Sequence, residues 1–407
     1  MMLCRSIRQV TKKKGVTMSM IKLQLVFFVI AATLVGGGLN SPFLESRDPW
    51  GTYVGKFYEV RAYSNGTTNY LGPYDTYGYR YQCVEWINRF YVQMMLHKNM
   101  RGSGDANQYY DKYESLGLNR YPNGGTEPPQ PKDILCSNGG LHGHVAIVRE
   151  VGSNYVKVIQ QNWYNDYRDS SMTLSMTVSG GHYTVSGFNS SYPIQGWLRK
   201  PPIAVYDYVH HIEDNWPEFT RYGPSNYWYE YTFDPANSSN TIGVCRNHLW
   251  WTYSNGNTIS NYGIWRPNLA YSGDYEIFVF VPANYATTQN AKYEIHHANG
   301  TTIVPVNQNN YYGIFVSLGQ FRFNAGTSGY VLLADNTGEP VQSRMIAFDD
   351  IAFVYKGEGG PVEEARAEQS GVFTFEINNS LNLSSTKIKY GLPKSCDVSL
   401  KIYNIAG

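Results

Sequence analysis

An amphipathic helix that begins at Cys83 is the feature that most constrains how this chain can fold. Its apolar residues, spaced by three and four as on one helix face, are Val84, Ile87, Phe90, Tyr91, Met94 and Met95. Two stretches of strand-like sequence follow at 145–151 and 155–161, separated by a Gly-Ser-Asn turn signal. One early helix followed by short strands predicts a helix packed on an antiparallel sheet.

Cys83 stands in the first turn of that helix, where unpaired backbone N–H groups and the helix dipole favour a thiolate. His144 opens the first strand, and Gln160 and Asn162 close its hairpin partner. Because neighbouring strands lie about 5 Å apart, these side chains can converge. The order predicts a cysteine nucleophile with a histidine base. A buried structural cysteine beside a structural histidine is the simpler alternative.

Four short motifs carry a family resemblance. They are Tyr81-Gln82-Cys83-Val84-Glu85, Gly143-His144-Val145-Ala146-Ile147-Val148, Gln160-Gln161-Asn162-Trp163 and Ile194-Gln195-Gly196-Trp197-Leu198-Arg199. In this order they resemble the CHAP family of cysteine- and histidine-dependent amidohydrolases and peptidases, which is similar to NlpC/P60 enzymes. The resemblance implies an α+β, papain-like domain, with an N-terminal helix packed on an antiparallel sheet, over residues 43–202.

The resemblance also implies roles for the site residues. Cys83 attacks an amide carbonyl as a thiolate, and His144 pairs with it and then protonates the departing amine. Gln160 stands where many relatives carry Glu, so we expect it to tune the site while Asn162 orients the imidazole more strongly. Gln82 and the backbone N–H of Cys83 are the expected oxyanion donors.

A second histidine and a metal site are the alternatives to this assignment. His142 lies two residues before His144, but the Gly-His-Val-Ala motif favours His144. Together with Cys136 and Asp133, the two histidines match no closed zinc spacing. No calcium-binding loop occurs in this region. We therefore expect neither a metal nor a cofactor.

The rest of the chain is dominated by strand-like sequence with Gly and Asn turns, which predicts a β-sandwich or jelly roll over 215–356. Its phrases resemble the golvesin C-terminal, xanthan-lyase carbohydrate-binding-like domain, which implies attachment to a surface or glycan. Residues 357–370 have the composition of a linker. Residues 371–407 resemble the first strands of the Ig-like modules found at FlgD and secretion-sorting C-termini, which predicts a partial Ig-like segment.

Composition and the N-terminus indicate where the protein works. Aromatic residues make up 15% of the 407 residues and charged residues only 16%, which fits strand-rich extracellular modules. The net charge of +1 gives no reason to expect nucleic acid as a partner. Residues 1–40 contain Lys22 followed by an apolar run, 23–35, which predicts a signal peptide or, as the alternative, an uncleaved membrane anchor. Five scattered cysteines argue against a disulfide scaffold, although a Cys83–Cys136 bridge is an alternative to a reactive thiol.

These observations predict a secreted, extracellular or cell-surface (alternatively periplasmic) peptidoglycan hydrolase. It would act as an N-acetylmuramoyl-L-alanine amidase or an endopeptidase through a Cys–His mechanism, with cell-wall peptidoglycan or a surface glycan as its partner. Two alternatives stay open. One is a wall- or glycan-binding adhesin whose site is degenerate at Gln160. The other is an amidase for a small conjugate of the glutathionylspermidine type, whose cytoplasmic substrate fits poorly with an export signal.

Overall fold

The computed structural model describes residues 48–66, 71–163, 171–202, 208–358, 374–378 and 387–391. All of these residues belong to one compact unit. The predicted signal or anchor segment, 1–40, lies outside the described residues, as do Cys4 and Cys396. Within the described part of the chain, no helix is long and apolar enough to cross a membrane.

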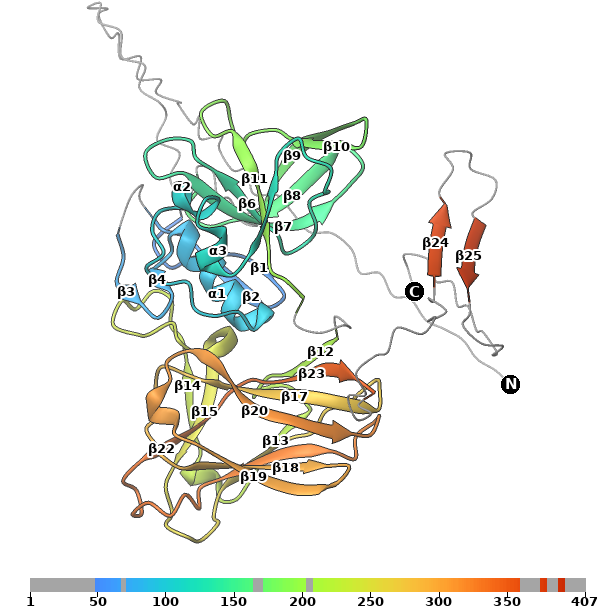
Figure 1. Ribbon diagram of the computed structural model, residues 1–407. Coiled ribbons are helices and arrows are strands. Elements are labelled where there is room, and N and C mark those ends of the chain that lie inside the picture. Colours follow the sequence, from blue (N-terminus) through green and yellow to red (C-terminus); the bar gives the residue numbers. More distant parts are fainter. Residues whose placement is uncertain are drawn as a thin grey trace, which may run out of the picture. The chain divides into compact units, whose positions relative to one another are not determined.

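Residues 48–202, called here the first region, combine three helices with a large antiparallel sheet (Figure 1). The helices are α1 (Cys83–Met95), α2 (Ala106–Tyr109) and α3 (Tyr113–Leu116). The strands are β1 (Tyr53–Phe57), β2 (Val60–Tyr63), β3 (Tyr74–Asp75), β4 (Gly78–Tyr79), β5 (Asn119–Pro122), β6 (Ile134–Ser137), β7 (His144–Val151), β8 (Tyr155–Ile159), β9 (Ser171–Ser179), β10 (His182–Val185) and β11 (Ile194–Arg199). Seven of them form one sheet in the order β10-β9-β8-β7-β6-β11-β5, with every neighbouring pair antiparallel.

Helix α1 packs on one face of this sheet, as the apolar spacing predicts. Ile87, Phe90 and Tyr91 are fully buried in one core with Val145 and Ile147 of β7. The next residues along β7, such as Ala146 and Val148, face a second core on the opposite side of the sheet, because strand side chains alternate. The predicted hairpin is confirmed: β7 and β8 pair antiparallel, and the Gly152 N–H closes the turn onto the Tyr155 carbonyl at 2.9 Å.

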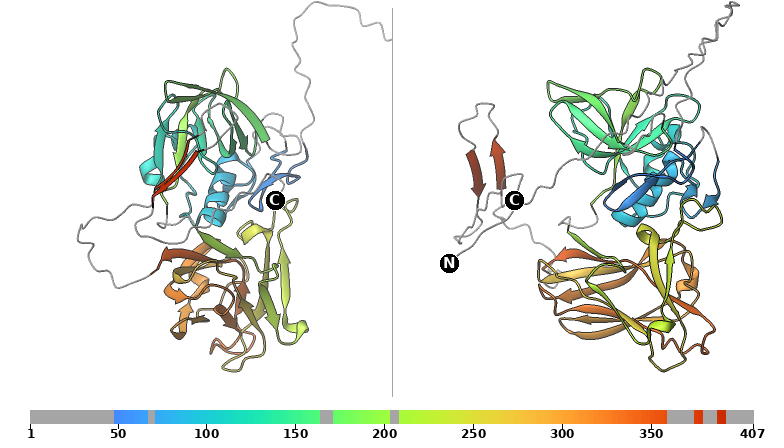
Figure 2. Two further views of the ribbon diagram at one scale, coloured as in Figure 1. Left: turned by 90° about the vertical axis from the view of Figure 1, so that its right-hand side faces the viewer. Right: turned by 180° about the vertical axis from the view of Figure 1, so that it is seen from behind.

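Residues 208–358 form the predicted β-sandwich. The strands are β12 (Val209–Ile212), β13 (Phe219–Tyr222), β14 (Tyr229–Thr232), β15 (His248–Tyr253), β16 (Tyr262–Trp265), β17 (Gly273–Val281), β18 (Ala291–His297), β19 (Gly300–Val306), β20 (Ile314–Phe323), β21 (Tyr330–Ala334), β22 (Met345–Phe348) and β23 (Ile351–Gly357), with 3₁₀ turns at Ser225–Tyr227, Cys245–Asn247 and Gln308–Asn310. A four-stranded sheet, β12-β23-β17-β20, faces a five-stranded sheet, β13-β16-β21-β18-β19, across one core (Figure 2). Strands β14-β15-β22 form a third, smaller sheet.

A segment of the sandwich, residues 234–244, is bonded to the chain just before α1. Arg80, only 2% exposed, donates to the backbone carbonyls of residues 237, 238 and 240 and pairs with Asp75 at 2.7 Å. The Tyr81 hydroxyl donates to the Pro235 carbonyl at 2.8 Å. Gly51 has a φ of +83°, and a Cβ there would lie 2.3 Å from the same carbonyl oxygen. The residues that precede Cys83 are therefore held by backbone atoms of the sandwich.

Toward the C-terminus, β24 (Thr374–Asn378) and β25 (Lys387–Gly391) pair antiparallel. This agrees with strand character in the segment for which a partial Ig-like module was predicted. The rest of that segment, and all of the predicted linker except 357–358, lies outside the described residues.

Candidate functional site

Cys83 occupies the position that the sequence predicts, as the first residue of α1. Its N-cap, Gln82, is extended, with φ −75° and ψ 154°. Backbone N–H groups of Val145, Val84 and Cys83 itself lie near the sulfur and favour the thiolate. Burial outweighs these donors and raises the pKa of the Cys83 thiol to about 11. This shift favours the neutral thiol at rest, in a residue that is only partly buried, and the resting thiolate–imidazolium pair stays a prediction.

Cys83 is not in a disulfide. Cys83, Cys136 and Cys245 are all free, so the alternative Cys83–Cys136 bridge is excluded. Cys136 is fully buried in the core under α1. The Val145 amide lies near the Cys83 sulfur, and Val145 directly follows His144 at the start of β7. The sulfur is therefore close to the first residues of β7.

His144 is the first residue of β7 and is only 2% exposed. Its ring lies 4.5 Å from the Trp163 ring and 4.9 Å from the Phe188 ring, centroid to centroid. Nε2 lies 2.8 Å from Oε1 of Gln160, which is also 2% exposed. An amide oxygen can only accept, so Nε2 carries the proton and Nδ1 keeps the lone pair. Burial lowers the pKa of His144 to about 4, so the imidazole is neutral.

Gln160, rather than Asn162, orients the imidazole. Asn162 adopts a positive φ of +55°, and its Nδ2 donates to Oε1 of Gln82 at 2.7 Å. The expectation that Asn162 is the main orienting residue therefore differs from the structure, because the turn after β8 directs its side chain to the helix N-cap. Asn162 binds the amide oxygen of Gln82. The NH₂ group of Gln82 is therefore the end of that side chain that can act as a donor. The oxyanion role of Gln82 stays a prediction.

Sequence reasoning missed a buried polar network next to these residues. Glu85 and Arg89, 0% and 1% exposed by side chain, pair within 2.6 Å on α1. Gln161, fully buried, donates to Glu85 at 2.9 Å and accepts from the Tyr63 N–H at 2.8 Å. The four-residue spacing of Glu85 and Arg89 was a readable signal for an ion pair on a helix. No local pattern marked Gln161 as their partner.

The competing base, His142, is placed differently from His144. Its side chain is 64% exposed, and its Nδ1 lies 2.9 Å from the Asp105 carboxylate. A solvent-exposed imidazole that already binds a carboxylate is a weaker candidate for the base than the buried ring held by Gln160.

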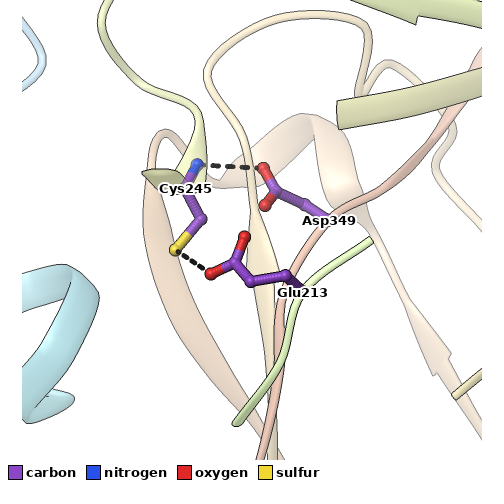
Figure 3. Close-up of side chains that lie close together, drawn as sticks. All are labelled: Glu213, Cys245 and Asp349. Atoms are coloured by element: carbon purple, nitrogen blue, oxygen red, sulfur yellow. Dashed lines mark hydrogen bonds between the residues drawn. The ribbon is translucent and has the colours of Figure 1, made fainter. Parts of the chain in front are cut away.

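One group of side chains in the sandwich has the composition of a metal site: Glu213, Cys245 and Asp349, all buried (Figure 3). The Cys245 sulfur lies 3.8 Å from Glu213 Oε1, and the Cys245 N–H donates to Asp349 at 3.1 Å. Arg246 already supplies a positive charge, with Nη1 2.6 Å from Glu213 Oε1. Burial raises the pKa of the Cys245 thiol, whereas a metal requires the thiolate. We therefore interpret the group as a buried ion-pair cluster.

Comparisons with known proteins agree with the two recognised resemblances. Residues 72–162 match the model of the CHAP domain, and residues 236–354 match that of the Golvesin C-terminal domain. Cys83, His144, Gln160 and Asn162 all fall within the CHAP match. The chain therefore carries a CHAP domain and a golvesin C-terminal domain. The FlgD-like end stays a prediction.

Over 92 residues the chain is 33% identical to a xanthan lyase of Bacillus sp. (strain GL1), a match that spans 22% of this chain and 10% of the lyase. Among solved structures, a Paenibacillus xanthan lyase aligns at a TM-score of 0.31 with 16% identity, over 58% of this chain and 26% of the lyase. A family 35 carbohydrate binding module from Clostridium thermocellum aligns at 0.25 with 15% identity, over 36% of this chain and 98% of the module.

Proposed function

We propose that this protein is a secreted cysteine-dependent hydrolase that cleaves an amide bond in cell-wall peptide, as an amidase at the sugar–peptide junction or as an endopeptidase. The observation that carries the proposal is the buried His144, held by Gln160 and next to the helix start at Cys83, all within a CHAP domain. CHAP domains are typically hydrolytic. The golvesin domain would hold the enzyme on a glycan of the wall.

The neutral resting pair sets the order of proton transfers. When a substrate carbonyl lies at the start of α1, the sulfur of Cys83 attacks the carbonyl carbon as Nδ1 of His144 takes the thiol proton. The Cys83 N–H and the Gln82 NH₂ group are the proposed donors to the oxyanion. Gln160 accepts from the imidazolium at Nε2 throughout. His144 then protonates the departing amine, and water, deprotonated by the same nitrogen, hydrolyses the thioester.

Hydrolysis of isolated walls tests the proposal. The full protein should lower the turbidity of a wall suspension and release soluble muropeptides, whose masses identify the cleaved bond. Two matched pairs of variants separate catalysis from folding. Cys83→Ala and His144→Gln should abolish release, whereas Cys136→Ala and His142→Gln should retain it. If wild type and Cys83→Ala behave alike on walls of several types, the enzyme assignment is wrong.

A second candidate, a non-catalytic adhesin, is favoured by the burial that raises the pKa of Cys83 and lowers that of His144, because both shifts favour the neutral forms. The two functions differ in a sedimentation assay. If the protein is an adhesin, the full protein should sediment with intact walls, Cys83→Ala should bind equally well, and neither should release product.

Export of the full chain to the medium, compared with a chain that lacks residues 1–40, tests the proposed secretion.

A further inference from the structure

We propose that Gln161 is a positioning residue: with the buried Glu85–Arg89 ion pair, it fixes the turn that carries Gln160 to the helix that carries Cys83. The inference rests on the proposed hydrolase function, because it assigns a role in that site. Among the described residues, the side-chain hydrogen bonds of Gln161 go to Tyr63, Gln82, Glu85 and Arg89, and none goes to Cys83 or His144. It would act through its neighbours.

The side-chain amide of Gln161 has partners at both ends. Oε1 accepts from the Tyr63 N–H at 2.8 Å and from Arg89 Nη2 at 3.4 Å. Nε2 donates to Glu85 Oε2 at 2.9 Å and to the Gln82 carbonyl at 3.3 Å. Gln161 therefore bridges β2, the N-cap of α1 and the ion pair in its interior. Buried polar networks of this kind impose a single geometry when every member is satisfied.

The ion pair gives this bridge a rigid anchor. Arg89 Nε lies 2.6 Å from Glu85 Oε1, and Arg89 Nη1 donates to the Arg61 carbonyl at 2.7 Å. A buried pair is stable only when its remaining donors and acceptors are also bonded. Gln161 supplies one acceptor for Arg89 and one donor for Glu85, so the pair and the amide require each other.

The consequence for catalysis follows from the order of three consecutive side chains. Gln160 binds His144 Nε2 at 2.8 Å, Gln161 binds α1, and Asn162 binds the Gln82 side chain at 2.7 Å. A displacement of Gln161 would therefore move two residues together: Gln160, which binds His144, and Gln82, which is the N-cap of α1. A misplacement of about 1 Å can cost about 100-fold in rate.

Only an amide can both donate to Glu85 and accept from Arg89 at this position. Glutamate at 161 would place a second carboxylate against Glu85 with a single guanidinium between them. Methionine has similar length but would leave Glu85 and Arg89 short of partners. These two replacements, together with the charge swap Glu85→Gln/Gln161→Glu, dissect the bridge, since the swap restores one carboxylate, one amide and one guanidinium.

The test measures hydrolysis and the protonation of His144 in the full protein. Gln161→Met should lower kcat by about 10- to 100-fold with little change in KM. NMR titration of histidines labelled at Cε1, with His144 assigned through His144→Gln, gives the second readout. Burial holds the pKa of His144 at about 4. When the turn loosens and water reaches the ring, that pKa should rise by at least one unit toward its ordinary 6.5.

Gln93→Met is the matched control. Gln93 is also buried on α1, 1% exposed, but it donates to the Val244 carbonyl at 2.9 Å, away from the 160–162 turn. It should lower the melting temperature without moving the His144 pKa. Gln161→Glu and Glu85→Gln should each impair kcat more than their combination does. An unchanged His144 pKa and kcat in Gln161→Met, or an equal pKa shift in Gln93→Met, would overturn the proposal.

Two further outcomes are also decisive. If Gln161→Met does not fold, the charge swap Glu85→Gln/Gln161→Glu decides. A swap variant with restored kcat and a low His144 pKa supports the bridge. A folded swap variant with a raised His144 pKa refutes it. If wild type hydrolyses no wall, the proposed function fails, but the His144 titrations of the same variants still decide whether Gln161 positions the turn.

Discussion

Replacing Gln160 with Glu should move the acid limb of the pH–rate profile to higher pH. The amide oxygen lies 2.8 Å from His144 Nε2 in a buried site, so a carboxylate there would stabilise the imidazolium directly. Two unit charges about 4 Å apart attract by about 4 kcal/mol at an effective dielectric constant of about 20. Desolvation of the new carboxylate offsets part of this, which leaves roughly 1–3 kcal/mol, or about one to two pKa units.

The direction of the shift follows from the proposed role of His144 as a base. In the free enzyme the base must be neutral, so its pKa sets the acid limb of kcat/KM. That limb should lie near pH 4 in wild type, because burial lowers the pKa of His144 to about 4. In Gln160→Glu the limb should lie between about pH 5 and 6. The rate near neutral pH should hold or rise, because the imidazolium formed during attack is stabilised.

The assay is kcat/KM for muropeptide release from one defined wall across the acid and neutral range. Gln160→Met is the control, since it keeps the length but loses the hydrogen bond, which should cost about 1 kcal/mol, or about five- to tenfold in rate. An acid limb in Gln160→Glu that coincides with wild type would refute the assignment of His144 as the titrating base. A harmless Gln160→Met beside an inactive Asn162→Ala would restore Asn162 as the orienting residue.

Three further outcomes are expected. Cys83 should react slowly with iodoacetamide near neutral pH and faster up to about pH 11, because burial raises its pKa to about 11; fast labelling at neutral pH would contradict a neutral resting thiol. The free energy of unfolding should fall by up to about 3 kcal/mol between about pH 6.5 and 4, since the unfolded chain protonates His144 first, and urea titrations of His144→Gln should lack this component. Arg80→Met should cost about 3–5 kcal/mol by leaving Asp75 buried and unpaired, whereas Lys56→Ala, which removes an exposed pair, should cost under about 1 kcal/mol in thermal unfolding.

Local sequence was sufficient for the parts of the fold that depend on periodicity and turns. The spacing of Ile87, Phe90 and Tyr91 predicted the buried face of α1, and the Gly152 turn predicted the hairpin that brings Gln160 to His144. These features depend on contacts within one element or between adjacent strands. Such contacts leave a regular pattern in the sequence.

The remaining features depend on contacts between distant residues or on burial. The helix end favours a Cys83 thiolate, whereas the core against which this partly buried residue packs favours the neutral thiol. The role of Asn162 changed because a single positive φ turned its side chain toward Gln82. Gln161 bonds to residues about 75 to 100 positions earlier in the chain, which no local pattern encodes.

The bonds from Arg80 to the carbonyls of the sandwich segment bear on how such a protein can evolve. Arg80 lies three residues before Cys83 and donates to main-chain oxygens of residues 237, 238 and 240. Point substitutions in that segment would preserve those oxygens, whereas a change in its length or path would not. Gene fusion that joins this CHAP domain to a different binding domain would leave a buried guanidinium without acceptors. We therefore expect the CHAP domain and the golvesin domain to be inherited together. Exchanging either domain between relatives should fail unless residues 234–244 are exchanged with it.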